Sequence, residues 1–333
     1  MKILVLGGCG RMGRIIAADL AKKYEVVVAD VKPDADIVMD GGGYNYLAKA
    51  IKGHDLVVGA LPSIFGYDAM LAAIDSGVNY VDLSFTSHDV SKLNDLAIKN
   101  GVSVLHDCGI APGVSNLIIG RAIKNGARDI DIYVGGVAAD EKDDYVISWN
   151  TNDLYEEYIR PARIIKNGKV ETIPPLINVS DIDAETGLRG YVTDGLRSLL
   201  KKALLVENMK EYTWRWPGHI EKISVLLGNR DRFVSGMKEL YTEGNNDMLA
   251  MKIVADGKAV SMCVYGNEEM SAMARTTALS CSAFAQLLIS GKYVKTGIIP
   301  PEDIALDDDA YKFVLDRMAK NGVEFNIRYP FNE

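Results

Sequence analysis

The sequence has few cysteines and no spacing typical of a metal site. Its four cysteines, at positions 9, 108, 263 and 281 of the 333 residues, form neither a Cys-x-x-Cys pair nor a Cys/His pattern of the kind that binds zinc. Nothing in their spacing indicates the disulfide framework of a small extracellular domain. We therefore expect free thiols and no structural metal.

Long apolar runs and dense basic segments are also missing. No stretch approaches the roughly 18 uncharged apolar residues that a membrane-spanning helix needs, and the opening residues MKILVLGGCG lack the features of a secretory signal. Acidic residues outnumber basic residues by 45 to 37, the net charge is -8, and the lysines and arginines are dispersed. The sequence therefore predicts a cytoplasmic protein that acts on a small molecule, with neither a membrane nor a nucleic acid as partner.

Length and composition indicate a globular protein with more than one core. Hydrophobic residues make up 48% and charged residues 25% of the chain, which is average for folded domains. A chain of 333 residues also exceeds the size at which a single hydrophobic core stops growing. We therefore expect two packed units.

The first third of the chain alternates between short β-branched runs and segments of helical period. Several runs are apolar on both faces, so the strands they predict would be buried between two layers of helices. The alternation predicts an α/β fold with a doubly wound parallel sheet. The expected strands cover residues 2–6, 25–29, 55–58, 78–83 and 102–106, and the expected helices cover residues 11–23, 67–76 and 89–100.

The pattern changes near residue 125. Two-residue turn signals, Asn167-Gly168 and Asp256-Gly257, stand at the centres of expected hairpins over residues 163–173 and 249–265. A helical run over residues 195–206 lies between the two hairpins, and a second one extends over residues 268–289. We expect a first domain over residues 1–125, an inserted α+β domain with a mainly antiparallel sheet over residues 126–267, and C-terminal helices over residues 268–333 that return to the first domain.

A glycine-rich turn directly follows the first expected strand. Gly8, Gly10 and Gly13 form a GxGxxG pattern that leaves the strand KILVLG and opens a helix. In such turns the first glycine permits the tight turn, the second lets backbone approach a pyrophosphate and the third allows close helix packing. The helix start at Arg11 and Met12 would offer N–H groups to the phosphates.

This turn predicts that residues 1–125 form a dinucleotide-binding domain of the Rossmann type, which leaves residues 126–267 for substrate binding; that they also form a dimer interface is implied only by the family resemblance described below. The alternative is a glycine-rich turn without a ligand.

The end of the second expected strand indicates which dinucleotide is bound. Asp30 comes 17 residues after Gly13, close to the spacing at which a carboxylate binds the adenosine ribose hydroxyls. Its charge repels a 2′-phosphate, so we expect Asp30 and Val31 to favour NAD over NADP, although Lys32 softens that preference. The alternative is a solvated loop carboxylate.

A second loop reaches the same edge of the expected sheet. Gly59-Ala60-Leu61-Pro62 follows the strand over residues 55–58, and cofactors lie along this edge in doubly wound folds. We expect Ala60, Leu61 and Pro62 to line the dinucleotide; a plain loop is the alternative.

A polar segment that begins at His106 leaves the last of these strands. A metal site on His106, Asp107 and Cys108 is disfavoured, because adjacent strand residues alternate faces and cannot converge on one ion. For Cys108 a small buried thiol is favoured over a nucleophile, because no partner base is identifiable.

The segment TWRWPGH over residues 213–219 brings two ionisable groups beside aromatic residues. Arg215 can hold a carboxylate through two parallel hydrogen bonds, and His219 titrates near neutral pH. Trp216 can exclude water from a pocket. The alternatives are an interdomain salt bridge for Arg215 and a helix N-terminal position for His219.

Four motifs, in this order, give the chain a family resemblance. GGCGRMG, CGIAPGVSN, YVTDGLRSLL and WRWPGH resemble segments of the saccharopine dehydrogenase and lysine 6-dehydrogenase family, and the resemblance extends over nearly the whole chain through GIIPPEDI. It implies a Rossmann domain with an inserted α/β domain, a bound nicotinamide dinucleotide, and a homodimer. It also implies chemistry at a carbon–nitrogen bond of a lysine-like amino acid.

The resemblance implies roles for individual residues. The loops that contain Cys108 and Trp216 would flank the substrate, and Asp194 of VTDGL matches a further family motif. We assign the substrate α-carboxylate to Arg215 and the proton relay to His219. Asp107 is a second candidate for that relay.

The carboxylate of Asp30 favours the NAD-linked branch of the family. We therefore expect an NAD-dependent lysine 6-dehydrogenase, which oxidises the terminal amine to an imine that water hydrolyses to an aldehyde and ammonia. The first alternative is a saccharopine dehydrogenase or reductase, or a carboxynorspermidine dehydrogenase, with NADP. The alternative outside enzymes is an NAD-binding regulatory protein.

Overall fold

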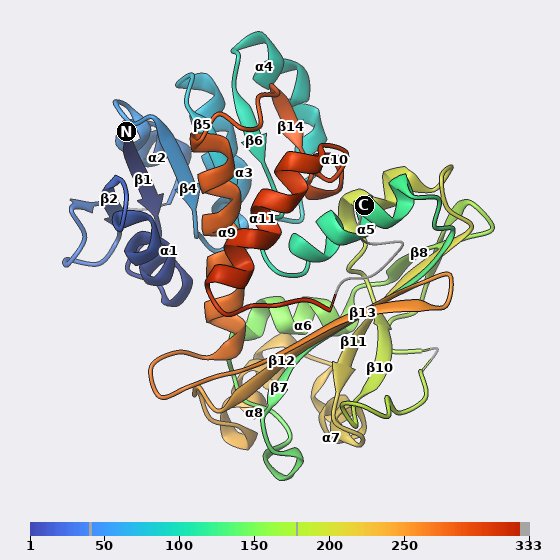
Figure 1. Ribbon diagram of the computed structural model, residues 1–333. Helices are drawn as coiled ribbons and strands as arrows, with labels where there is room; N and C mark the ends of the chain where they lie inside the picture. Colours follow the sequence, from blue (N-terminus) through green and yellow to red (C-terminus); the bar gives the residue numbers. More distant parts are fainter. Residues whose placement is uncertain (40–41, 178, 327–333) are drawn as a thin grey trace. The chain divides into compact units, whose positions relative to one another are not determined.

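The computed structural model describes residues 1–39, 42–177 and 179–326, and the chain divides into two compact units. Unit 1 contains Met1–Gly120 and Thr277–Gly322, and unit 2 contains Arg121–Thr276 and the segment from Val323 onward. The chain passes from one unit to the other within helix α5 (Val114–Lys124) and again within helix α9 (Ala272–Ile289), both marked in Figure 1.

Unit 1 is built on a seven-stranded parallel sheet, which confirms the doubly wound α/β fold expected from the sequence. The strand order is β14-β6-β5-β4-β1-β2-β3, and the paired strands run parallel. Residues 3–6 of β1, an interior strand of the sheet, are fully buried, because a strand covered on both faces needs apolar side chains on both. The strands are β1 (Lys2–Leu6), β2 (Glu25–Asp30), β3 (Ile37–Val38), β4 (Leu56–Gly59), β5 (Asn79–Asp82), β6 (Ser103–Leu105) and β14 (Gly297–Ile299).

The helices of unit 1 agree with the sequence pattern in place but not in length. The expected helix over residues 67–76 begins earlier, at Ser63, and the one over residues 89–100 is split into a 3₁₀ turn and a short α-helix. Besides α5 and α9, the helices of unit 1 are α1 (Arg11–Ala21), α2 (Tyr44–Ile51), α3 (Ser63–Asp75), η1 (Val90–Leu93), α4 (Asn94–Lys99), α10 (Pro301–Ile304) and α11 (Asp308–Lys320).

The strand order of unit 1 reverses between β1 and β4. β2 follows β1 on one side, whereas β4 lies on the other. Ala60 N–H donates to the Leu6 carbonyl at 2.9 Å and so ties the loop after β4 to the end of β1. Open α/β sheets bind their ligands at this point.

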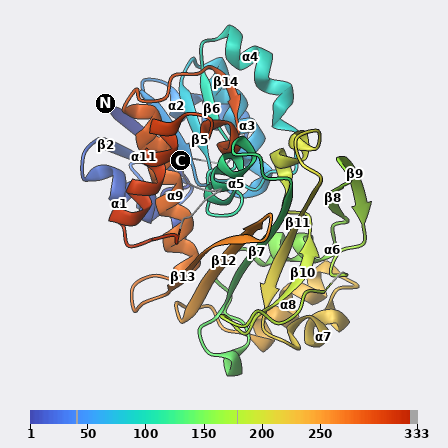
Figure 2. The same cartoon turned by 45° about the vertical axis from the view of Figure 1, so that its right-hand side comes forward.

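Unit 2 is built on a mixed sheet that is mainly antiparallel, as expected, with one parallel pair. The order is β13-β12-β7-β11-β8-β9, with β10 also paired to β11; β7 and β11 run parallel, and the other pairs are antiparallel. Figure 2 shows β12, β7, β11 and β10 side by side. The strands are β7 (Asp129–Ala138), β8 (Ala162–Lys166), β9 (Lys169–Ile173), β10 (Arg189–Thr193), β11 (Asn208–Arg215), β12 (Asp247–Ala255) and β13 (Lys258–Tyr265).

Both hairpins expected in this half of the chain are present. Asn167 and Gly168 have φ of 50° and 70°, and Asp256 and Gly257 have φ of 48° and 76°. Two consecutive residues with positive φ characterise the turns that match the right-handed twist of a hairpin. The two turns therefore set the registers of β8 with β9 and of β12 with β13.

The helices of unit 2 include one correction. The helix expected over residues 195–206 is only a 3₁₀ helix, η3 (Arg197–Lys202); Arg197 has a φ of 52°, so no right-handed helix runs through it from residues 195–196. The other elements are η2 (Glu141–Asp143), α6 (Thr151–Ile159), α7 (His219–Ile223), η4 (Ser224–Leu226) and α8 (Arg230–Leu240). Among the helices of the described residues, none combines the length and the apolar character needed to cross a membrane.

Aromatic side chains pack against both faces of the unit 2 sheet. On one face Tyr133 stacks on Tyr212 and Trp214, with ring centroids 4.7 and 5.4 Å apart. A separate buried cluster gathers residues of α6, α7 and α8 with the segment before α6; it includes Tyr145, Tyr155, Tyr158, Phe233 and Tyr241. This second cluster surrounds two of the residues singled out by the sequence.

Candidate functional site

The glycine-rich loop of unit 1 turns tightly between β1 and α1. Gly7 N–H donates to the Ala29 carbonyl at 2.8 Å, and Gly10 N–H donates to the Gly7 carbonyl at 3.0 Å. Helix α1 begins directly after Gly10, whose position is capped by no side chain of the described residues. A helix start of this kind directs backbone N–H groups toward an anionic ligand.

Each glycine of the loop has its own steric reason, and one differs from the expectation. The positive φ of the tight turn, 73°, is at Gly7 and not at Gly8. Gly8 is needed for packing instead, because a Cβ there would lie 2.6 Å from Val28 Cγ1. A Cβ at Gly13 would lie 2.2 Å from the Gly7 oxygen, whereas a Cβ at Gly10 would meet only that oxygen, at 3.1 Å. Gly10 is thus the position that is open for a ligand.

Asp30 ends β2 and is bound to the glycine-rich loop. One carboxylate oxygen accepts the Cys9 N–H at 3.0 Å, and the other accepts the Lys32 N–H at 3.2 Å. The Lys32 ammonium donates to the Cys9 carbonyl at 3.2 Å. The ribose end of a dinucleotide would therefore meet both a carboxylate and an ammonium group.

The remaining residues assigned to the cofactor lie on the first turn of α1 and on the loops at the carboxyl ends of β2 and β4. Their exposure varies: Val31 is 61% exposed, and Arg11 and Pro62 are also exposed, while the other three are partly buried. These residues are Arg11 and Met12 after β1, Val31 after β2, and Ala60, Leu61 and Pro62 after β4. Neighbouring parallel strands thus bring the predicted cofactor residues to one edge of the sheet.

The polar segment after β6 is less regular than expected. β6 ends at Leu105, so residues 106–108 are not on a strand and the argument from alternating faces was wrong. Asp107 has a φ of 55° and lies with a carboxylate oxygen 3.3 Å from His106 Nδ1. In the part of the chain that the structure describes, no group of three His, Cys, Asp or Glu side chains is placed to hold a metal ion.

Cys108 is a buried thiol. Its side chain is fully buried, and burial raises its pKa well above the usual value, with the nearby Cys281 and Asp82 adding to the effect. The thiolate is therefore disfavoured, and Cys108 lacks the character of a nucleophile. Asp107 is also buried, at 4% exposed.

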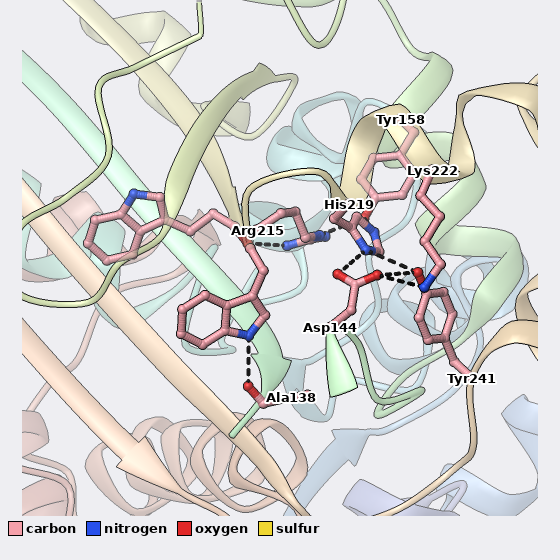
Figure 3. Close-up of polar contacts among 9 residues, drawn as sticks. Ala138, Asp144, Tyr158, Arg215, His219, Lys222 and Tyr241 are labelled. Atoms are coloured by element: carbon pink, nitrogen blue, oxygen red, sulfur yellow. Dashed lines mark hydrogen bonds and ion pairs between the residues drawn. The ribbon is translucent and has the colours of Figure 1, made fainter. Parts of the chain in front are cut away.

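Arg215, the last residue of β11, is held in a buried polar network of unit 2 (Figure 3). Its Nε donates to the Tyr158 hydroxyl at 2.6 Å, Nη1 donates to the Trp214 carbonyl at 2.8 Å, and Nη2 donates to Glu157 at 3.3 Å. The salt bridge with Glu157 lies within unit 2, which corrects the interdomain alternative. Arg215 is only 2% exposed, so its guanidinium is engaged by the protein itself.

His219 opens α7 and joins the same network. Its Nδ1 lies 2.9 Å from Asp144 and its Nε2 lies 3.2 Å from the Tyr158 hydroxyl. Because the Tyr158 oxygen already accepts from Arg215, its O–H is free to donate to Nε2, and Nδ1 then carries the proton donated to Asp144. Asp144 also accepts hydrogen bonds from Tyr241 and, at 3.3 Å, from Lys222.

The charges of this network are set by its burial. Burial lowers the pKa of His219, and the charges of Arg215 and Lys222 lower it further, against the opposing effect of Asp144. For Asp144 burial raises the pKa, but the hydrogen bonds from His219 and Tyr241 and the charge of Lys222 outweigh it and leave the pKa lowered. A neutral histidine, 1% exposed, thus faces an ionised carboxylate.

Three members of this network have no sequence signal that would have found them. Asp144, Tyr158 and Tyr241 lie 75, 61 and 22 residues from His219 along the chain. They stand in no motif with it and reach it only through tertiary packing.

Of the two remaining residues assigned to the substrate, Trp216 lies beside His219, whose N–H donates to the Trp216 carbonyl at 3.1 Å, whereas Asp194 is bound to Arg163. Trp216 follows β11, and its indole N–H donates to the Ala138 carbonyl at 3.0 Å (Figure 3). Asp194 accepts three hydrogen bonds from Arg163, two from the guanidinium at 2.8 Å and one from the backbone N–H at 3.0 Å. Within the described residues, Asp194 makes no hydrogen bond to Arg215 or His219.

Two family models together match almost the whole chain. The model described as the saccharopine dehydrogenase NADP binding domain matches residues 3–105, and the one described as the saccharopine dehydrogenase C-terminal domain matches residues 109–231 and 232–323. The boundary between them lies between β6 and α5.

The curated relatives that match have low sequence identity to this chain and are longer than it. The chain is 26% identical over 168 residues to saccharopine dehydrogenase (NADP+, L-glutamate-forming) of Schizosaccharomyces pombe, a match that covers 47% of this chain and 37% of that protein. It is 27% identical over 165 residues to the mitochondrial alpha-aminoadipic semialdehyde synthase of Rattus norvegicus, which covers 46% and 17%. The matches therefore span well under half the length of these relatives.

A solved structure has the same fold over its whole length. The apo, histidine-tagged saccharopine dehydrogenase (L-Glu forming) of Saccharomyces cerevisiae superposes with a TM-score of 0.76 over 98% of both chains, at 18% identity.

Proposed function

Because the chain belongs to the saccharopine dehydrogenase family, we propose that it is a nicotinamide-dependent oxidoreductase that breaks or forms a carbon–nitrogen bond of a lysine-like amino acid. A saccharopine-type secondary amine is the first candidate substrate, because the curated relatives are named as saccharopine dehydrogenases.

One observation carries the proposal more than any other. The family models extend over residues 3–105 and 109–323, so the match includes both the nucleotide half and the second half of the chain. The glycine-rich loop supports the nucleotide half, since Gly10 is open at the start of α1 and Gly13 has no room for a side chain.

The reaction sets requirements for the residues around the substrate. A bound nicotinamide dinucleotide would accept a hydride from the carbon beside the substrate nitrogen. The substrate amine must lose a proton first, and water then hydrolyses the imine to an aldehyde and a free amine, so a proton acceptor is needed near the nitrogen. A cation is needed for the substrate carboxylates.

Arg215 and His219 are proposed for these tasks on the resemblance alone. Arg215 and His219 are only 2% and 1% exposed, and both are fully hydrogen-bonded within unit 2. These observations favour a structural role, in which the two residues stabilise unit 2. Asp107, at 4% exposed, is the other proposed proton acceptor.

A second candidate function is an NAD-dependent lysine 6-dehydrogenase, and Asp30 favours it. The hydrogen bonds from the Cys9 and Lys32 N–H groups hold the Asp30 carboxylate at the end of β2, where it would repel a 2′-phosphate. Lys32 acts in the opposite sense, and the relatives that match are named for NADP. We propose NAD as the preferred cofactor and NADP as a usable one.

The test is an assay of the purified protein with NAD+ and with NADP+ against saccharopine, L-lysine, L-ornithine and simple diamines, read as reduced nicotinamide. Turnover of saccharopine with release of glutamate supports the first candidate, and turnover of lysine with release of ammonia supports the second. Dinucleotide binding without turnover of any of these compounds would contradict both and favour a regulatory protein.

The homodimer and the cytoplasmic location expected from the sequence stay predictions. Light scattering during size-exclusion chromatography measures the first directly, with a mass twice the 36.3 kDa of the chain as the expected result.

A further inference from the structure

A cavity of about 610 Å³ lies in unit 2, and Trp214 of β11 is part of its lining. Trp214 and Arg215 are consecutive residues of the strand, so their side chains lie on opposite faces of the sheet. Trp214 therefore lines the cavity from the face opposite to that of the Arg215 and His219 network. The volume of the cavity is within the range typical of small-molecule sites.

The walls of the cavity are mainly aromatic and apolar. Three methionines of β12 and β13 contribute thioethers, which adapt to the shape of a ligand and make favourable contacts with aromatic rings. These walls fit a flat, apolar ligand. The four rings of the lining are those of Trp214, Trp216, Tyr265 and Phe325.

The segment from Val323 onward forms part of the wall. Asn326 N–H donates to the Ser261 carbonyl at 3.2 Å, which holds the segment against β13, the strand at one end of the sheet order. Phe325 is thereby brought into the lining. The wall thus combines the sheet with a segment that follows α11 in the chain.

The indole N–H of Trp214 has no hydrogen-bond partner. Trp214 is only 2% exposed, and no described residue offers an acceptor to its Nε1, whereas the Trp216 N–H donates to the Ala138 carbonyl. A buried donor without an acceptor costs free energy, and buried indole N–H groups usually find a partner. A ligand in the cavity that carries an acceptor would supply one.

The charged residues of the wall indicate the charge of the ligand. Lys252 is paired with Asp183 at 2.6 Å, whereas Glu185 and Glu324 are exposed and form no ion pair with any described residue. The unpaired charge at the cavity is therefore negative, which disfavours an anion. A cation would meet the N–H donor of Trp214 where it needs an acceptor. The lining therefore favours an uncharged ligand.

We propose that this cavity binds an uncharged aromatic compound that carries a carbonyl group. The carbonyl oxygen accepts the Trp214 N–H, and the ring contacts the aromatic and methionine side chains. Saccharopine and lysine are multiply charged, so this ligand is not the substrate considered above and the site goes beyond the proposed function. Because the lining residues all belong to unit 2, binding requires no dinucleotide.

The experiment is an NMR titration of the full chain, labelled with ¹³C at the methionine methyl groups, with four probes of similar shape. 1-Indanone has an aromatic ring and a carbonyl group, indane lacks the acceptor, and indane-1-carboxylate and 1-aminoindane carry opposite charges. The twelve methionines report on the whole chain. Met248, Met251 and Met262 report on the cavity.

We expect 1-indanone to shift the signals of these three methionines and to bind at least about threefold more tightly than indane and than either charged probe. Trp214→Phe keeps a ring and removes the N–H. It should weaken 1-indanone binding by about threefold to tenfold, the range of one neutral hydrogen bond, and leave indane binding unchanged. Trp149→Phe is the matched control, since the Trp149 N–H donates to the Tyr145 hydroxyl and neither residue lines the cavity.

A second variant tests the site without touching Trp214. Ser261 lines the cavity from β13, so Ser261→Phe should fill part of the space and weaken the binding of 1-indanone and of indane alike. This variant decides the question if Trp214→Phe does not fold.

Several results would overturn the proposal. They are an absence of shifts at the three cavity methionines, equal affinity of the wild type for indane and 1-indanone, tighter binding of a charged probe, and undiminished 1-indanone binding by folded Trp214→Phe or by Ser261→Phe. 1-Indanone contains no carbon–nitrogen bond, so either outcome is independent of whether the protein oxidises an amine.

Discussion

The imidazole of His219 donates from Nδ1 to the Asp144 carboxylate at 2.9 Å, although the two residues come from different parts of the chain. Asp144 has a φ of 60°. This backbone conformation is unfavourable for residues other than glycine and is retained only when surrounding contacts compensate for its energetic cost. The hydrogen bonds that Asp144 accepts from His219, Lys222 and Tyr241 supply that compensation. The loop before Tyr145 is thereby tied to α7 and to the residue after α8.

This pairing predicts a pH dependence of stability. The pKa of His219 is lowered in the folded protein by its burial, so the unfolded chain binds more protons between the folded pKa and the ordinary value of about 6.5. The free energy of unfolding should therefore fall as the pH drops below about 6.5. Chemical denaturation of wild type and His219→Gln from about pH 8 to about pH 5 checks this, and we expect a smaller loss in the variant. Parallel curves for the two proteins would show that His219 is not the group responsible.

Two glycines of the loop after β1 should respond differently to the same added methyl group. A Cβ at Gly13 would lie 2.2 Å from the Gly7 oxygen, whereas a Cβ at Gly10 would lie 3.1 Å from it with nothing else in reach. Gly13→Ala should lower the melting temperature, while Gly10→Ala should fold normally and bind dinucleotide at least about tenfold more weakly, because the methyl group occupies space needed by a pyrophosphate. Melting curves and fluorescence titration separate the two effects. A Gly10→Ala protein with unchanged affinity would place the pyrophosphate elsewhere.

The two charges at the end of β2 should select the cofactor in opposite directions. Asp30 is held by the N–H groups of Cys9 and Lys32, so Asp30→Asn removes the charge and one of the two acceptor oxygens. We expect this variant to bind NADP more tightly relative to NAD, and Lys32→Ala to bind NADP several-fold more weakly with little change for NAD. Dissociation constants for both dinucleotides measure these ratios. If both ratios stay constant, the ribose does not lie between these two side chains.

Removing the charge of Glu211 should stabilise the protein in alkali. Its folded pKa of about 8 exceeds the usual value, so the folded protein holds a proton that the unfolded chain has lost, and stability declines as the pH rises from about 4.5 to about 8. Glu211→Gln should therefore melt at a higher temperature than wild type near pH 8.5, by about 2–4 °C for each kcal/mol gained, and the difference should vanish near pH 4.5. Differential scanning fluorimetry across this range decides. A variant that is less stable at every pH would mean that Glu211 makes a favourable contact in the folded state.

The features that could be predicted from the sequence are those encoded within a few consecutive residues. The turn after β1 and the two hairpins are of this kind, because a glycine pattern or an Asn-Gly pair acts on the backbone where it stands. Even there the residue in the left-handed conformation is Gly7, which the GxGxxG pattern does not contain. The pattern identifies the glycines at which a side chain would not fit. The position of the turn, however, depends on the contacts of the loop after β1 with Val28 and Ala29 of β2.

The features that could not be predicted from the sequence depend on contacts between residues that are far apart along the chain. No sequence feature near Arg215 indicates that Tyr158 will accept its hydrogen bond or that Glu157 will neutralise its charge, and none near Glu211 indicates that Gly195 will lie against it. The parallel pairing of β7 with β11 is equally hidden, because local turn signals specify antiparallel neighbours only. Two residues of the same chemical type can therefore differ in burial and in hydrogen-bond partners, and these differences do not show in the sequence.

The insertion of unit 2 into unit 1 bears on how the chain is made. β14 pairs with β6 at one edge of the unit 1 sheet, yet every strand of unit 2 lies between them in the chain. During synthesis the nascent first half therefore presents β6 with an unpaired edge until residues 297–299 leave the ribosome, whereas all strands of unit 2 are available once residue 265 has emerged. The sheet of unit 2 can be completed before the sheet of unit 1. Interruption of translation within α9 would therefore leave a complete unit 2 sheet, still without the unit 2 segment from Val323 onward, attached to an open, aggregation-prone sheet.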